Sequence, residues 1–193
     1  MSLVETKNDL LKDLNLNGNA DYRIIDAMVE GDTKYLKDLR INLKNAIAAD
    51  NISVKEAYLI ALSVAVNEKN VALIESFTKL AKDNEAGESE IAEIHACTSL
   101  LSVNNVFYRF RHFVGKDSYN KMPAKIKMNV MLNPVLGKPF FELVSLVISA
   151  LNGCETCVKS HEAHLIQLGV SEERIFDSIR LASVVKGLCV TIN

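Results

Sequence analysis

Proline is scarce in this chain of 193 residues, and its three copies all fall in one window, at positions 123, 134 and 139. Proline is the strongest helix breaker, so the chain on either side of this window contains little that would stop a helix. Strand-like alternation of apolar and polar residues is also hard to find, whereas Ala, Leu, Glu and Lys, which favour helix, are abundant. The sequence therefore predicts an all-α fold.

The chain also lacks strong charge of one sign and long apolar runs. Its formal net charge is −2, and no cluster of Lys and Arg interleaves with aromatics, so nothing favours binding to nucleic acid or an anionic membrane. Residues 1–9 contain neither the basic nor the apolar segment of a secretory signal. The longest apolar run is about half of the roughly 20 residues that a membrane-spanning helix needs. We expect a single cytoplasmic domain over residues 1–193.

Cysteines are few: the chain has four, and in a reducing compartment they would not form a disulfide framework. Cys97 and Cys189 each stand alone in apolar surroundings, where the simplest interpretation is a small buried hydrophobe. Cys154 and Cys157 differ, because two cysteines at this spacing form a potential redox dithiol.

The segment from Gly153 to His161 carries this dithiol and a histidine four residues beyond its second cysteine. If a helix begins at Cys154, then Cys154, Cys157 and His161 lie along one stripe of it. The helix N-terminus favours anions and therefore thiolates, His161 can exchange protons with Cys157, and the two sulfurs can close into a disulfide.

Glu142 is the one acid at the start of the otherwise apolar run that leads into this segment. It precedes the predicted helix break at Asn152–Gly153 by ten residues, roughly 15 Å along a helix. In an antiparallel hairpin it would come level with His161 and His164, where a carboxylate could orient an imidazole. The alternative is an exposed glutamate that only stabilises the helix start.

Other chemistries for the same residues are less consistent with the spacing. A zinc site from Cys154, Cys157, His161 and His164 would require one straight helix of about 15 Å to wrap around a single ion. Covalent haem attachment needs a histidine directly after the second cysteine, where Val158 stands. A chance pair of cysteines remains the uninformative alternative.

Helix signals recur along the chain and suggest an internal repeat. Ser53 with Glu56, Ser89 and Ser171 are predicted helix caps. A shift of 86 residues places Glu56 on Glu142, which predicts a degenerate half at about 20–105 and a CxxC-bearing half at about 122–193. Further expectations are a first helix over 9–16, a linker with an aromatic-rich helical segment at 104–113 that packs on the core or forms a subunit interface, and a short helix at 124–130.

The pattern Glu142-x11-Cys154-x2-Cys157-x3-His161 resembles the motif of the alkyl hydroperoxide reductase AhpD family, within the carboxymuconolactone decarboxylase-like superfamily. The resemblance covers most of the chain and is weakest before about residue 40. Further similar segments are 104–110, 128–130, 141–143 and 151–154.

The resemblance implies an AhpD-like fold of two similar helical halves, assembled as a homotrimer. It implies an antioxidant peroxidase that reduces alkyl hydroperoxides, takes electrons from the dihydrolipoyl group of a carrier protein, and regenerates the peroxiredoxin AhpC, with no bound cofactor or metal. Carried onto this sequence, Cys157 would become the sulfenic acid and bond to the partner. Cys154 would be the proton donor and resolving thiol of a Cys154–Cys157 redox disulfide, with Glu142 and His161 as the relay.

One position departs from the family pattern. The best-known members have a histidine just before the second cysteine, where this chain has Thr156, which cannot titrate. The main hypothesis is therefore an alkyl hydroperoxide reductase, and the second is a reductant adaptor with little peroxidase activity of its own. A third is a cofactor-free decarboxylase or lactone-acting enzyme that uses Glu142 and His161, a chemistry that has no need of the cysteines.

Overall fold

The computed structural model describes residues 2–18 and 20–193; Met1 and Asn19, which the predicted domain includes, lie outside the described residues. Over these residues the chain forms α-helices and one short 3-10 helix, with no strand, so the all-α prediction is confirmed. The helices are α1 (Leu3–Asp13), α2 (Arg23–Glu30), α3 (Tyr35–Ile47), α4 (Val54–Asn67), α5 (Val71–Asp83), α6 (Glu88–Val114), α7 (Asp117–Lys121), η1 (Asn129–Met131), α8 (Lys138–Leu151), α9 (Glu155–Gln167) and α10 (Glu172–Thr191).

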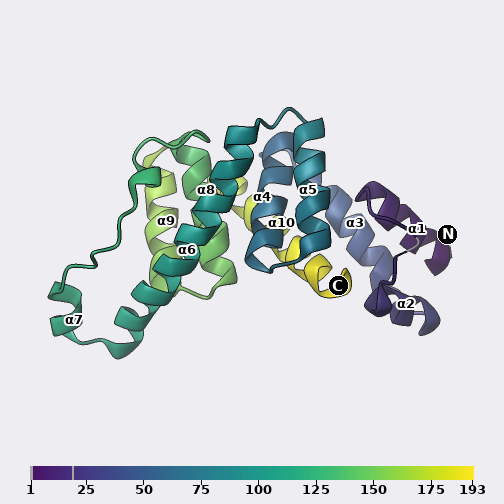
Figure 1. The fold of residues 1–193 in the computed structure, drawn as a ribbon, viewed down its shortest axis with the longest axis horizontal. Coiled ribbons are helices and arrows are strands. Elements are labelled where there is room, and N and C mark those ends of the chain that lie inside the picture. Colours follow the sequence, from purple (N-terminus) through teal and green to yellow (C-terminus); the bar gives the residue numbers. More distant parts are fainter. Residues whose placement is uncertain (1, 19) are drawn as a thin grey trace.

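Two helical hairpins form the body of the molecule (Figure 1). Helix α4 packs on α5, and α8 packs on α9, while α6 lies against α4, α8 and α9 and so bridges the two hairpins. Helix α10 packs against α4 and α8, and α1–α3 extend from the opposite end from α9 (Figure 1). Every residue from Phe140 to Ser149 in α8 is buried, which makes this apolar helix the centre of the half that carries the cysteines.

Capping residues explain where several helices begin. Ser53 and Glu56 form the predicted capping box of α4, and Ser171 Oγ accepts the Arg174 amide at the start of α10. The predicted Ser89 cap is wrong. The N-cap of helix α6 is Gly87, two residues earlier, where the Glu90 carboxylate accepts the Gly87 amide at 2.8 Å. The predicted bounds of the first helix are also wrong at both ends. It begins earlier, at Leu3, because Ser2 and Glu5 form a capping box, and it ends earlier, at Asp13, before Asn15 with its φ of +52°.

The segment 104–113 is not part of a linker but the continuation of α6, which runs unbroken from Glu88 to Val114. The helical interpretation of its aromatic-rich part is therefore correct, and the absence of Gly and Pro from 88–114 explains the continuity. The short helix expected at 124–130 is wrong. Lys125 has φ +52°, which interrupts a right-handed helix, and only η1 forms near that segment's end.

The two segments of the predicted internal repeat have the same order of elements. Both α4–α5–α6 and α8–α9–α10 begin with an apolar helix that forms a hairpin with the next helix. Asn67 at the end of α4 donates to Asn152 after α8 at 3.2 Å, which joins the two hairpin bends. The common origin of the halves stays a prediction. What the arrangement does establish is that the bend before α9 is tied to the other half of the molecule.

Candidate active site

The turn between α8 and α9 positions the first cysteine. Gly153 has φ +66°, the left-handed conformation that suits glycine after a helix end. The Cys154 amide donates a hydrogen bond to the Ser149 carbonyl at 3.0 Å. Cys154 is therefore the N-cap residue of α9 rather than its first helical residue. It is 1% exposed, Cys157 is 8% exposed, and the two form a disulfide.

Glu142 lies opposite His161 and His164 in the α8–α9 hairpin, as the helix arithmetic predicted. Its Oε2 is 2.6 Å from His161 Nδ1, and its Oε1 is 3.1 Å from His164 Nδ1. At 7% exposure, Glu142 is not the exposed helix-start residue of the alternative. Burial alone would raise the pKa of this carboxyl, but the hydrogen bond and charge of His161, together with those of His164, outweigh it and lower the pKa.

A pocket of about 250 Å³ opens beside the second cysteine. From α9 it is lined by Thr156, Cys157, Ser160 and His161, so His161 both contacts Glu142 and faces the pocket that holds Cys157. The other walls were not predicted from sequence: they comprise Leu101, Asn104 and Tyr108 of α6, with Met128 and Met131 of the connection that follows. The i, i+3, i+7 spacing on α6 is the signal that could have revealed the helix wall.

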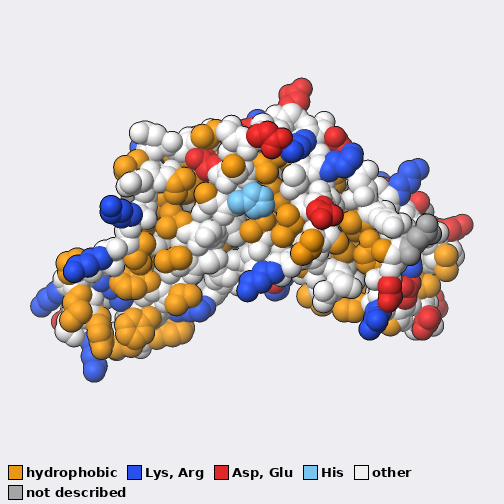
Figure 2. Space-filling model, in the orientation of Figure 1, with side chains coloured by type: hydrophobic (Ala, Val, Ile, Leu, Met, Phe, Trp, Pro, Cys, Tyr) orange, Lys and Arg blue, Asp and Glu red, His pale blue; other side chains and the backbone are white. Residues whose placement is uncertain are grey.

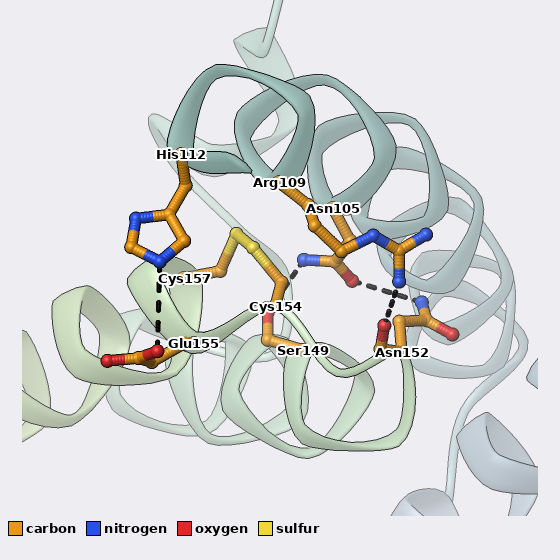
Figure 3. The surroundings of a disulfide bond; sticks show 8 residues. All are labelled: Asn105, Arg109, His112, Ser149, Asn152, Cys154, Glu155 and Cys157. Carbon is orange, nitrogen blue, oxygen red and sulfur yellow. Dashed lines mark hydrogen bonds and ion pairs between the residues drawn. A yellow bond between two sulfur atoms is a disulfide. The ribbon is translucent and has the colours of Figure 1, made fainter. Parts of the chain in front are cut away.

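A polar cluster behind Cys154 ties α6 to the α8–α9 turn (Figure 3). Asn105 Nδ2 donates to Ser149 Oγ at 3.0 Å, and Asn105 Oδ1 accepts from Asn152 Nδ2 at 3.0 Å. Arg109 donates to the carbonyl of Asn152. Because Asn152 immediately precedes the Gly153–Cys154 step, these contacts fix the turn on which the disulfide depends.

A histidine and a carboxylate meet beside the disulfide. His112 of α6 lies 3.7 Å from Glu155, the residue after Cys154 (Figure 3). Tyr108 and Thr156 separate the apolar pocket from a second hollow of about 300 Å³, which Arg111 and His112 also line. Thr156 therefore stands between an apolar pocket and a more polar hollow that contains Arg111, in the place where the family resemblance implies a histidine.

The connection before α8 covers Glu142 and His164. Both oxygens of the buried Glu93 carboxylate accept backbone amides from this connection, Val135 at 2.8 Å and Leu136 at 2.7 Å. Met131 and Pro134 then line a small hollow of about 70 Å³ with Glu142 and His164. The carboxylate–histidine group is thereby covered by a segment anchored on α6.

The two remaining cysteines are buried, as predicted. Burial raises the pKa of each thiol to about 12, so both stay protonated at neutral pH. A protonated buried thiol is a poor nucleophile. Of the four cysteines, only Cys154 and Cys157 lie where they could react.

The described residues contain neither a cluster of metal ligands nor a membrane-spanning helix. Within residues 2–18 and 20–193, no group of three or more His, Cys, Asp or Glu side chains is placed to hold a metal ion. None of the helices in the described ranges combines the length and apolar character that crossing a membrane requires.

Comparison with known proteins finds relatives that match most of this chain. The alkyl hydroperoxide reductase AhpD of Anaeromyxobacter dehalogenans (strain 2CP-C) is 34% identical over 169 residues, which are 88% of this chain and 90% of the relative. The protein of the same name from Rhodopseudomonas palustris (strain BisB18) is 36% identical over 88% of this chain and 93% of its own length. This chain belongs to the AhpD family. The AhpD of Coxiella burnetii (strain Dugway 5J108-111) is 38% identical over 80% of this chain and 88% of its own length.

The AhpD relatives match this chain over most of its length, whereas a second match falls mainly on the half that carries the cysteines. The Carboxymuconolactone decarboxylase family model matches residues 118–192, which run from α7 to α10. The recognition made from Glu142, Cys154, Cys157 and His161 is therefore confirmed at the level of the AhpD family.

Proposed function

We propose that this AhpD-family protein reduces alkyl hydroperoxides to alcohols through the Cys154–Cys157 pair. The observation that carries the proposal is the position of Cys157, which shares an apolar pocket with His161, itself paired with buried Glu142. A thiol, a proton carrier and space for an organic group thus meet at one place. Family membership supports the same chemistry, since the relatives are named for it.

The proposed cycle has two steps on the protein and one from outside. The Cys157 thiolate attacks the terminal oxygen of the hydroperoxide, the O–O bond breaks, the alkoxide takes a proton and leaves as the alcohol, and Cys157 becomes a sulfenic acid. The Cys154 thiol then attacks the Cys157 sulfur, forms the disulfide and releases water. A dithiol reductant reopens the disulfide by exchange and is itself oxidised.

Glu142 and His161 form the proposed proton relay. Because Nδ1 of His161 faces the carboxylate, its Nε2 is the nitrogen left to exchange protons with groups in the pocket. The second carboxylate oxygen lies by His164, which holds Glu142 between two imidazoles. In this role Glu142 orients His161 and stabilises its charged form when the ring takes up a proton from Cys157.

The electron source and partners follow from the family. We expect a dihydrolipoyl-carrier protein as reductant, the peroxiredoxin AhpC as a partner that Cys157 reduces, a homotrimeric assembly, and a cytoplasmic location. Thr156 favours a second candidate function. Because this side chain next to Cys157 cannot titrate, the protein could react slowly with hydroperoxides and act instead as a reductant adaptor that passes electrons to AhpC.

One assay tests the function. The reduced protein receives cumene hydroperoxide and dihydrolipoamide, with and without AhpC, and turnover is followed with the variants Cys154→Ser and Cys157→Ser. We expect wild-type turnover, none with Cys157→Ser, and intact activity in the control Cys97→Ala, whose thiol is buried away from the pocket. Turnover only with AhpC supports the adaptor. Full activity in both serine variants overturns the dithiol mechanism.

A further inference from the structure

Asn104 is a buried amide in the wall of the pocket beside Cys157. Its side chain lies on α6, and the residue is 6% exposed. Its Nδ2 has only the thioether of Met128 as a partner, at 3.2 Å, and sulfur is a weak acceptor. Among the described residues, Asn104 Oδ1 is the one buried side-chain oxygen or nitrogen atom without a hydrogen-bond partner.

The next residue along α6 shows that this helix can satisfy a buried amide. Asn105 is 1% exposed, and its side chain donates to Ser149 and accepts from Asn152. Asn104 instead lines the pocket beside Cys157, whose neighbouring walls are Leu101, Met128 and Met131. An unpaired acceptor in such surroundings destabilises the fold, and its presence therefore points to a ligand that pairs with it.

We propose that Asn104 Oδ1 accepts the O–H of an apolar hydroperoxide, or of the alcohol made from it, and so fixes the oxygen end of the ligand beside Cys157. The apolar body of the ligand packs on Leu101, Met128 and Met131, in a pocket whose volume of about 250 Å³ suits a small aryl or alkyl group. The ligand must donate a hydrogen bond, so a hydrocarbon of the same shape lacks the group that Asn104 recognises.

The same hydrogen bond selects the oxygen that reacts. In a hydroperoxide the hydrogen is on the terminal oxygen, which is the one that the thiolate attacks. A hydrogen bond from this oxygen to Asn104 therefore holds it on the pocket side of Cys157, with the leaving oxygen and its organic group toward the methionines. That the ligand is a hydroperoxide rests on the proposed function. That Asn104 binds a ligand with a hydroxyl donor does not depend on it.

Binding to the oxidised protein tests the recognition without any turnover. Benzyl alcohol and toluene are titrated separately into wild type and Asn104→Leu, a substitution close in shape that removes both amide ends. Binding is followed through the ¹³C-labelled methyl groups of Met128 and Met131. We expect wild type to prefer the alcohol, and Asn104→Leu to lose about 3- to 10-fold of that preference, the size of one hydrogen bond. Asn45→Leu, at an exposed position on α3, is the matched control and should keep it.

A second arm measures the reaction itself. Oxidation of the reduced protein by cumene hydroperoxide should slow in Asn104→Leu, while exchange with oxidised lipoamide, which has no O–H to present, should keep its wild-type rate. If wild type does not react with the hydroperoxide, the proposed function falls and the binding arm still decides the role of Asn104. An unchanged alcohol preference in Asn104→Leu, or no alcohol binding by wild type, overturns the inference. Should Asn104→Leu fail to fold, Asn104→Ala is measured in the same way.

Discussion

Glu142 joins the stability of the fold to the chemistry of the site. Its folded-state pKa is lowered from the ordinary value of 4.5, because the contacts with His161 and His164 outweigh burial. A lowered folded pKa means that the ionised carboxylate stabilises the fold above about pH 4.5, and that this stabilisation is lost as the pH falls through the folded pKa. The stabilisation by the ionised carboxylate is therefore fully present at neutral pH and changes only at acid pH.

The variant Glu142→Gln should therefore be less stable than wild type at pH 7, and its stability should fall less than that of wild type on acidification. We expect a loss of about 1.5–3 kcal/mol at pH 7, the range for a hydrogen bond to a charged group. The difference from wild type should shrink as the pH falls below 4.5. Urea unfolding measured between pH 7 and pH 3 gives both quantities.

Glu162→Gln provides the matched control for this prediction, because Glu162 is an exposed carboxylate next to His161 on α9. Its stability should follow wild type within about 0.5 kcal/mol at every pH. If Glu142→Gln and wild type differ by the same amount at pH 7 and pH 3, the carboxylate is not the source of the acid dependence.

At the scale of elements, the site depends on how α6 grips the turn between α8 and α9. Asn152 donates to Asn105 of α6, accepts from Asn67 of α4, and presents its carbonyl to Arg109. One side chain thus joins both hairpins at the residue that leads into Gly153 and Cys154.

Replacing Asn152 by alanine should loosen this junction. Asn105 Oδ1 is left without its donor in a position that is 1% exposed, and we expect a loss of about 1–3 kcal/mol in the free energy of unfolding. Closing of the Cys154–Cys157 disulfide should also slow, since the turn that carries Cys154 is less fixed. Urea unfolding and thiol trapping after a hydroperoxide pulse measure the two effects.

The exposed residue Asn45 of α3 supplies the comparison, and Asn45→Ala should change neither measurement. A wild-type rate of disulfide closing in Asn152→Ala would show that the backbone contacts of the turn, such as Cys154 to Ser149, position the cysteine without the side-chain cluster.

Sequence patterns located the α8–α9 hairpin well because its information is local. The apolar run, the glycine break and the offset of Glu142 from His161 depend only on helix geometry, and the structure has them in contact. The pocket walls escaped prediction because they come from elsewhere in the chain. Asn104 reaches the site only because α6 continues where a linker was expected, and Met128 lies in an irregular segment that carries no periodic signal.

The outer face of α6 raises a question about the whole molecule. Figure 2 shows hydrophobic side chains gathered at the lower left, over the C-terminal part of α6 and the region of α7. Val106 is 62% exposed and Phe113 is 74% exposed, and a shallow groove of Val103, Val106, Phe107, Phe110 and Ile126 runs between them. Helix α7 itself has no buried residue, so its own chain gives it little apolar support.

A second copy of the chain is the occupant we expect on this face, in line with the trimer proposed from the family. Exposed aromatic and aliphatic side chains gathered in this way are typical of subunit interfaces. The double variant Val106→Glu/Phe113→Glu should be monomeric where wild type is trimeric, because each buried glutamate would lose its hydration.

Light scattering after size-exclusion chromatography measures the mass directly. Phe176→Glu, on α10 and 68% exposed, is a matched control that should leave the assembly intact. A monomeric wild type, or a trimeric double variant, would place the interface elsewhere or remove it, and the apolar face of α6 would then need a different partner.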